Sequence, residues 1–207
     1  NKRIITYGLT ENANFKAANI SFTQNVTNFE IQINGEYIDK IEVPLIGKHN
    51  VLNSLAALIV ASEFNIPLTT SKEALKHFLG IERRFEKRGS FKEITIVDDY
   101  AHHPTEITAT LKAARETHNG RIVIIFQPHR FTRTRDHLNE FADSLREADV
   151  ILISEIYAAG ETPISGIDSE RICEIIRRKG HKKVLDVGEL DKAMPATMKV
   201  LEEGDLV

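Results

Sequence analysis

The chain has 207 residues, of which 42% are hydrophobic and 28% are charged, an ordinary mixture for a soluble globular protein. Its formal net charge of -3 creates no global field that would favour nucleic acid or an anionic membrane. No apolar run approaches the roughly 20 residues that a membrane-spanning helix needs. The single cysteine, Cys173, excludes an internal disulfide and fits a reducing compartment. We therefore expect a cytoplasmic protein with no nucleic-acid or membrane partner.

The first part of the chain predicts β structure followed by helices. Residues 3–45 indicate β structure: Phe29, Ile31 and Ile33 alternate with polar neighbours, and Asn34-Gly35 is typical of a two-residue hairpin turn. Apolar residues then recur at helical spacing over residues 51–64, and a second helix is expected over residues 71–78. The chain opens on a strand-like stretch and ends where an apolar strand begins. We therefore expect it to be part of a longer polypeptide.

Beyond Gly80 the pattern alternates between strands and helices. The predicted strands are apolar on both faces, which indicates a mostly parallel sheet covered on two sides, as in α/β proteins. We place a domain boundary so that residues 1–80 and 81–207 belong to different domains. The predicted strands cover residues 95–97, 121–126, 150–154 and 183–186, and the predicted helices cover residues 104–117, 134–147, 169–179 and 189–201.

Ligands of open parallel sheets bind in the loops that follow the carboxyl ends of the strands. That rule selects residues 98–104, 127–133 and 155–160. The first stretch holds two aspartates and two histidines within residues 98–103. Such a cluster suits a metal ion or a nucleotide, and a carboxylate at this edge can accept hydrogen bonds from ribose hydroxyls. In the structural alternative an aspartate caps the next helix and the histidines are solvated.

The second stretch concentrates arginines just before a predicted helix. Arg130 and Arg133, with Arg135 as a further candidate, offer planar guanidinium groups that bind carboxylates and phosphates through two hydrogen bonds. The alternative is a solvated basic loop, or salt bridges to Asp136 and Glu140. We favour a small anionic ligand, because the basic patch is small and the chain as a whole is acidic.

Two further motifs have strong structural alternatives. Asn50 and Asn53 are one helical turn apart, and two carboxamides on one face suit the edge of an adenine. Capping of the helix by Asn50 alone is the simpler interpretation. Arg84, at the predicted domain junction, fits an interdomain salt bridge better than a ligand contact. Cys173 lies among isoleucines, so we expect it to pack in the core.

Five stretches, taken together and in order, resemble the Mur ligases that build peptidoglycan precursors. The last two are similar to the member that adds L-alanine, and the resemblance covers nearly the whole chain. It implies the end of an ATP-binding central domain, with β hairpins and helices, over residues 1–80. A Rossmann-like carboxy-terminal domain would follow over residues 81–207. The stretches are residues 47–57, 83–85, 98–106, 126–135 and 156–161.

Carried over position by position, the resemblance implies a nucleotide site. Asn50 and Asn53, with His49 beside them, would face the adenine of ATP. Asp99 would accept from the ribose hydroxyls, and Arg84 would reach the phosphates as a catalytic residue. The family's glycine-rich phosphate loop is not found in this sequence. We expect that loop and the Mg2+ ligands upstream of residue 1, with no metal ligand within the chain, so the chain alone should turn over no ATP.

The resemblance also implies a substrate side. The substrates would be UDP-N-acetylmuramate and L-alanine, joined through an acyl phosphate, with His102 as a second catalytic residue. Arg130 or Arg133 would hold the substrate carboxylate, and the sequence does not decide between them. Oligomeric state is left open as well. The residues expected to line this side are Tyr100, His102, His129, Arg130 and Arg133.

Three functions of other kinds remain as alternatives. A murein tripeptide ligase of cell-wall recycling is similar around residues 98–104, but it usually differs in the loop that here carries His129, Arg130 and Arg133. A folylpolyglutamate synthetase has the same implied fold, and the loop over residues 129–135 argues against both enzymes. A non-catalytic anion-binding domain is supported only by the missing phosphate loop.

Overall fold

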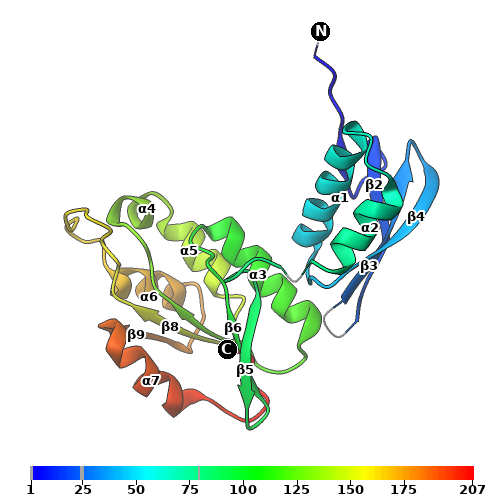
Figure 1. Cartoon of the computed structure of the whole chain (residues 1–207). Coiled ribbons are helices and arrows are strands. Elements are labelled where there is room, and N and C mark those ends of the chain that lie inside the picture. Colours follow the sequence, from blue (N-terminus) through cyan, green and yellow to red (C-terminus); the bar gives the residue numbers. More distant parts are fainter. Residues whose placement is uncertain (1, 24–25, 79) are drawn as a thin grey trace. The chain divides into compact units, whose positions relative to one another are not determined.

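The computed structural model describes residues 2–23, 26–78 and 80–207. The chain folds as two compact units, Asn1–Glu82 and Arg83–Val207, each with its own hydrophobic core (Figure 1). None of the helices in the described ranges is long and apolar enough to cross a membrane.

The first unit is a four-stranded sheet covered by two helices. Alternate residues of the sheet, among them Phe29 and Ile41, are fully buried against apolar side chains of the first helix such as Val51 and Leu55. The second helix begins three residues earlier than predicted, because Pro67, with a φ of -57°, takes the N-cap position. In spatial order the strands are β1 (Tyr7–Gly8), β2 (Phe15–Thr23), β3 (Val26–Ile33) and β4 (Glu36–Val43), and the helices are α1 (Lys48–Glu63) and α2 (Leu68–Lys76).

The predicted hairpin turn between β3 and β4 is confirmed. Ile33 pairs with Glu36, so the two residues between them form the whole loop. Asn34 has a φ of 51° and Gly35 a φ of 88°. Two consecutive positive φ values define the turn whose twist matches that of the flanking strands, and asparagine followed by glycine is its preferred sequence.

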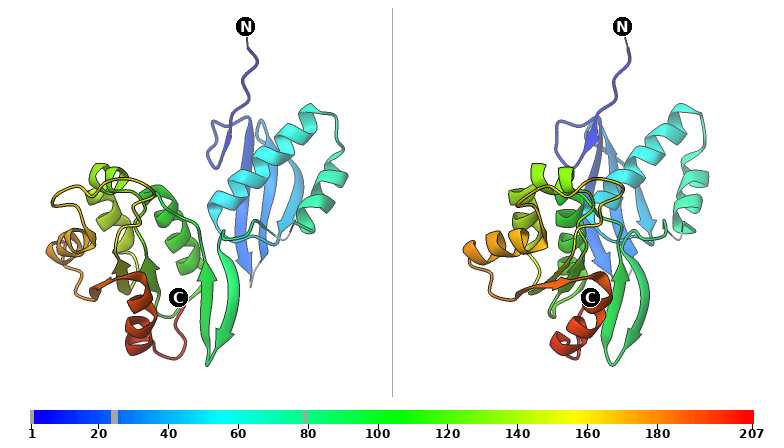
Figure 2. Two further views of the ribbon diagram at one scale, coloured as in Figure 1. Left: turned by 60° about the vertical axis from the view of Figure 1, so that its left-hand side comes forward. Right: turned by 90° about the vertical axis from the view of Figure 1, so that its left-hand side faces the viewer.

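The second unit is built on a mostly parallel sheet. Residues 205–207 lie between β6 and β7 and bond to both: Thr95 N donates to Asp205 O at 2.9 Å, and Val123 N donates to Leu206 O at 2.8 Å. Only β5 runs antiparallel, forming a two-stranded ribbon with β6 that Figure 2 shows in green. The strands are β5 (Glu86–Phe91), β6 (Ile94–Asp98), β7 (Val123–Phe126), β8 (Val150–Ser154) and β9 (Val184–Gly188).

Helices cover this sheet on both faces, as predicted. Ile151 and Ile153 of β8 belong to the core formed with α3, α5 and α6, whereas Val150 and Leu152 pack toward α7. The helix predicted over residues 134–147 is in fact two helices, divided at His137. The helices are α3 (Pro104–Thr117), α4 (Phe131–Asp136), α5 (Leu138–Leu145), α6 (Ser169–Arg178) and α7 (Ala193–Val200), the last preceded by a 3-10 turn over Leu190–Lys192.

Cys173 of α6 packs in the core, as predicted. Its side chain is fully buried beside Ile172 and Ile176. Burial raises the pKa of the Cys173 thiol to about 12, so the reactive thiolate is scarce near neutral pH. We therefore assign this cysteine no chemical role.

The start of α3 is a capping box. The His103 side chain accepts from Thr105 N at 3.3 Å, and Glu106 Oε2 accepts from His103 N at 3.2 Å and from His102 N at 3.0 Å. Burial acts to raise the pKa of Glu106, but the backbone N–H of His102, the His102 ring and the Arg84 guanidinium outweigh it. The pKa of Glu106 is therefore lowered.

We expect Gly35→Ala to lower the free energy of unfolding by about 1 kcal/mol, because an L residue resists a φ of 88°. A Cβ at this position would meet no atom within 4 Å, so the effect is conformational rather than steric. Asn34→Gly, the matched control, should leave stability within about 0.5 kcal/mol. Urea unfolding followed by circular dichroism measures the stability of both variants. A Gly35→Ala variant as stable as wild type would contradict the positive φ of this turn.

Replacing Glu106 tests the capping box and its charge separately. Glu106→Ala should cost about 1 kcal/mol through the lost cap, whereas Glu106→Gln keeps an acceptor for the two amides. A carboxylate with a lowered folded-state pKa stabilises above its unfolded pKa and loses that effect as the pH falls. The stability advantage of wild type over Glu106→Gln should therefore shrink between about pH 6 and about pH 3. If the difference in unfolding free energy between wild type and Glu106→Gln grew as the pH fell, the lowered pKa of Glu106 would be contradicted.

Candidate functional site

Three loops gather at one edge of the parallel sheet, because β6, β7 and β8 run in the same direction and end there. The loops after β7 and β8 are joined by backbone hydrogen bonds. Arg130 N donates to Tyr157 O at 2.8 Å, and Tyr157 N donates to Pro128 O at 2.8 Å. The His129 and Tyr157 rings lie 5.1 Å apart. The structure thus brings together the first, second and third stretches that the strand-end rule selected.

Two arginines of this edge have no salt-bridge partner within the described part of the chain. Arg130 is exposed and Arg133 is half-buried, and neither has a carboxylate within salt-bridge distance there. Arg135 differs, because its Nε donates to Asp136 Oδ1 at 2.7 Å. The salt-bridge alternative therefore holds for Arg135, while Arg130 and Arg133 keep their donors for a ligand.

The pKa of His129 is sensitive to the positive charge at this edge of the sheet. Burial lowers the pKa of His129, and electrostatic interactions with Arg133, His102 and Arg83 lower it further. The guanidinium groups of Arg133 and Arg83 are therefore near enough to act on this half-buried ring. A neutral imidazole among guanidinium groups leaves the arginines as the fixed positive charges, and such a surface favours an anion.

The Nδ1 atoms of the adjacent histidines have different roles. His102 Nδ1 lies 3.1 Å from the carbonyl oxygen of Tyr100 and 3.4 Å from Glu106 Oε2, so Nδ1 carries a proton that it donates to these oxygens. His103 Nδ1 instead accepts from Thr105 N, which places its proton on Nε2. Of the two rings, His103 uses its acceptor nitrogen for the helix cap, whereas the contacts of His102 engage Nδ1 and leave Nε2 for a ligand.

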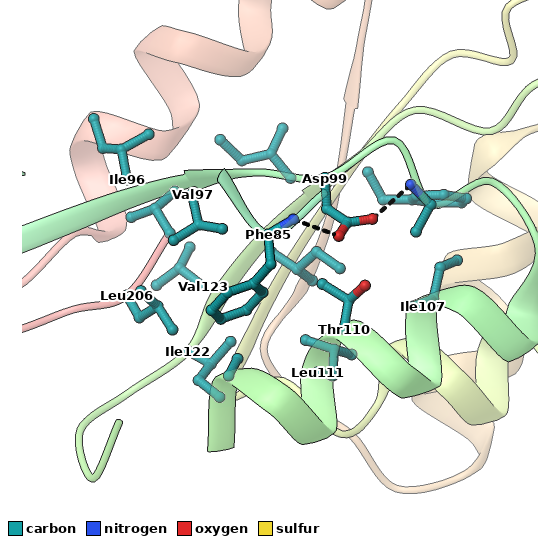
Figure 3. A pocket seen from close by; sticks show the side chains of 16 residues that line it. Phe85, Ile96, Val97, Asp99, Ile107, Thr110, Leu111, Ile122, Val123 and Leu206 are labelled. Carbon is teal, nitrogen blue, oxygen red and sulfur yellow. Dashed lines mark hydrogen bonds between the residues drawn. The ribbon is translucent and has the colours of Figure 1, made fainter. Parts of the chain in front are cut away.

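Asp99 organises the loop rather than capping α3. Its Oδ2 accepts from Phe85 N at 2.9 Å and its Oδ1 accepts from Ala101 N at 2.8 Å, as the dashed lines in Figure 3 show. The helix cap comes from His103 and Glu106, so the structural alternative in which an aspartate caps the helix is wrong. A carboxylate oxygen has two lone pairs, so each oxygen of Asp99 can still accept once more. Its contact with a ribose stays a prediction.

Both arginines of the predicted junction make contacts inside the second unit. Arg84 Nη1 lies 3.5 Å from Glu106 Oε1. Arg83 Nε lies 3.3 Å from Asp98 Oδ2, and its guanidinium carbon lies 4.6 Å from the ring centre of Tyr100. These are weak, half-exposed ion pairs that a phosphate could replace.

The predicted adenine residues lie in the first turns of α1. Gly47, with a φ of 100°, is the N-cap, so the prediction that Asn50 caps this helix is wrong. Asn50 is half-buried and its Nδ2 donates to Ile46 O at 2.9 Å, which leaves Oδ1 as the atom it presents. Asn53, one turn further on, is exposed and His49 is half-buried.

A cavity of about 210 Å³ in the second unit is a poor ligand site. It lies between β6 and β7 under α3, in line with residues 205–207 (Figure 3). Its lining is apolar except for Asp99 and Thr110, so it offers a charged ligand no cationic group. The charged edge is therefore the better candidate. Among the described residues, no group of three His, Cys, Asp or Glu side chains is placed to hold a metal ion.

Sequence reasoning missed three contributors to this edge. Tyr157, Glu161 and Thr132 join the loops after β7 and β8: Glu161 accepts from Thr132 N at 2.9 Å and from Thr132 Oγ1 at 2.7 Å. Tyr157 and Glu161 follow the third predicted strand. The strand-end rule selected the stretches that contain Thr132 and Tyr157, and Glu161 directly follows the second of these, but the contacts between the loops that give them a role are visible only in three dimensions.

Comparisons with known proteins agree with this architecture. Residues 83–207 match the Mur ligase glutamate ligase domain, and residues 1–61 match the Mur ligase middle domain. The UDP-N-acetylmuramate–L-alanine ligase of Anaeromyxobacter dehalogenans is 43% identical over 206 residues, which is 100% of this chain and 45% of that protein.

Solved structures show the same likeness. The UDP-N-acetylmuramate–alanine ligase MurC of Thermotoga maritima has a TM-score of 0.78 and 28% identity, over 98% of this chain and 43% of that one. A murein peptide ligase of Psychrobacter arcticus has a TM-score of 0.62 and 27% identity, over 97% and 42%. The chain thus spans less than half the length of these relatives, and it belongs to the Mur ligase family.

Proposed function

We propose that the full-length protein containing this chain is an ATP-dependent ligase that joins L-alanine to UDP-N-acetylmuramate, a step of peptidoglycan precursor synthesis in the cytoplasm. One observation carries the proposal: Arg130 and Arg133 stand at the functional edge without a salt-bridge partner in the described ranges. Guanidinium groups suit carboxylates, and both organic substrates of this reaction carry one. The name of the 43% identical relative supports the same reaction.

The chemistry needs positioning and charge more than a protein nucleophile. A carboxylate is a poor electrophile, and phosphoryl transfer from ATP converts the lactyl carboxylate to an acyl phosphate. The amine of L-alanine then attacks the carbonyl carbon, the C–N bond forms, and inorganic phosphate leaves with the electron pair of the C–O bond. Negative charge develops on oxygens throughout, so fixed cations at the site lower the barrier.

On the substrate side, Arg130 or Arg133 holds the substrate carboxylate. Tyr100 and His129 line the site, and the acceptor nitrogen of His102 faces the amine that loses a proton. These roles are supported by the exposed Arg130, by the half-buried Arg133, by the exposed Tyr100 and by the contact of His102 Nδ1 with the Tyr100 carbonyl, which leaves Nε2 for the substrate.

On the nucleotide side, Arg84 binds phosphate oxygens and Asp99 accepts from the ribose hydroxyls. Asn53 offers the adenine edge both a donor and an acceptor, Asn50 offers Oδ1, and His49 lies beside them. Each of these groups suits the part of ATP that is assigned to it. We assign Mg2+ no ligand among the described residues, because they present no suitable group of side chains.

A murein tripeptide ligase is the second candidate, since the murein peptide ligase of Psychrobacter arcticus shares the fold at 27% identity. The two functions differ in what is joined to UDP-N-acetylmuramate. Supplying the full-length enzyme with L-alanine or with a murein tripeptide separates them, because only the preferred amine should drive phosphate release.

The test of the main proposal is phosphate release by the full-length enzyme with ATP, Mg2+, UDP-N-acetylmuramate and L-alanine, each omitted in turn. Release should need all four. Arg130→Ala and Arg133→Ala should each lower kcat/KM by about 10- to 100-fold, the effect of a lost hydrogen bond between charged groups.

Arg135→Ala is the matched control, because Arg135 lies on the same short helix but is paired with Asp136. It should stay within about threefold of wild type. Phosphate release that does not depend on L-alanine would refute this reaction. An equal loss in all three variants would instead indicate a general effect of positive charge.

A further inference from the structure

Arg130 has a backbone conformation that is unusual for any residue except glycine. Its φ is 73° and its ψ is 131°, which lies outside the ordinary left-handed helical region. An L side chain in such a conformation is strained, and it persists only where the surroundings over-determine it. The strain falls on the side chain that the proposed function uses to hold a carboxylate.

Hydrogen bonds fix the backbone on both sides of Arg130. Its N–H donates to Tyr157 O at 2.8 Å. Its carbonyl oxygen accepts twice from Thr134, from the backbone N at 3.1 Å and from Oγ1 at 2.9 Å. Thr134 is fully buried, so its hydroxyl has no alternative partner in water. Rotation of Arg130 to an ordinary φ would break these bonds.

A second connection holds the turn that follows Arg130. Both carboxylate oxygens of Glu161 accept from Thr132, one from its N–H and one from its hydroxyl. The N–H of Thr132, followed by its hydroxyl, lowers the pKa of Glu161, and the nearby charge of Arg130 adds to that effect. Glu161 thus ties the loop after β8 to the first turn of α4.

We propose that Thr134 and Glu161 are positioning residues that hold Arg130 in its strained conformation and so fix the direction of its side chain in the site. The direction of the Cα–Cβ bond relative to the chain depends on φ and ψ, so the strain determines where the guanidinium can reach. Pre-organisation of this kind lowers the entropy lost when a ligand binds. The role of these residues in substrate binding rests on the proposed function, whereas the strained conformation of Arg130 is independent of it.

The strain is tested without any substrate. In the full-length protein, Arg130→Gly and Arg130→Ala both remove the guanidinium, but only glycine relaxes at a φ of 73°. The thermal midpoint of the domain that contains residue 130 should be about 2–4 °C higher for glycine than for alanine. A midpoint for glycine equal to or below that for alanine would overturn the strain, whatever the enzyme's reaction is.

The positioning role is tested by kinetics. Thr134→Val, which keeps the shape and removes the hydroxyl, should raise the KM of whichever substrate is affected in Arg130→Ala by about 3- to 10-fold. Thr134→Ser should restore it. Glu161→Ala should raise the same KM, Glu161→Gln should restore most of it, and the KM of ATP should not change.

A double-mutant cycle separates positioning from direct contact. If Thr134 acts through Arg130, Thr134→Val should have no further effect on that KM once Arg130 is alanine. Independent, multiplying effects would refute the positioning role even where the ligase activity is intact. A full-length enzyme that shows no L-alanine-dependent release but keeps the midpoint difference would refute the proposed function alone.

Discussion

The parallel pairing of β7 with β8 is the constraint on which the functional edge depends. The two strands run in register from Val123 opposite Val150 to Phe126 opposite Ile153, so they end at the same level of the sheet. Because β8 is buried on both faces, a shift of one residue would exchange its two apolar sets between different cores. Beyond the strands the pairing is offset by one further residue, and His129 lies opposite Tyr157 in an isolated bridge. Core packing thus determines the spacing of the loops that carry the charged residues.

The acidic and basic side chains at this edge have different roles. Asp99, Glu106 and Glu161 each accept hydrogen bonds from backbone amides and hold the loops in shape. These acids are therefore committed to the protein's own backbone, and Arg130 and Arg133 are left without a salt bridge in the described ranges. The balanced composition of the chain conceals this local excess of available positive charge. An anion entering the edge meets donors that no internal carboxylate has to release.

The features predictable from sequence are those set by local pattern. Apolar strands, the Asn34-Gly35 turn and the strand-end loops are visible because periodicity and turn chemistry act over a few residues. The strand Glu86–Phe91 was missed, since it is an edge strand with polar, mostly exposed side chains and no alternating pattern. The break at His137 and the backbone role of Asp99 depend on partners far away in the chain. A residue pattern can therefore select a functional edge, but the atoms that are already occupied there are known only from the structure.

Arg130 shows why local rules fail where a site is built. By backbone preference the position suits glycine, yet it carries a large side chain with five donors. Backbone stability and the proposed ligand binding therefore make opposite demands on Arg130, and its neighbours resolve the conflict through hydrogen bonds. The buried hydroxyl of Thr134 and the two acceptors of Glu161 stabilise a conformation that local energetics disfavour. A departure from local preference that distant contacts maintain is the kind of feature expected at a functional site. It is evidence for a site that is independent of any similarity to other proteins.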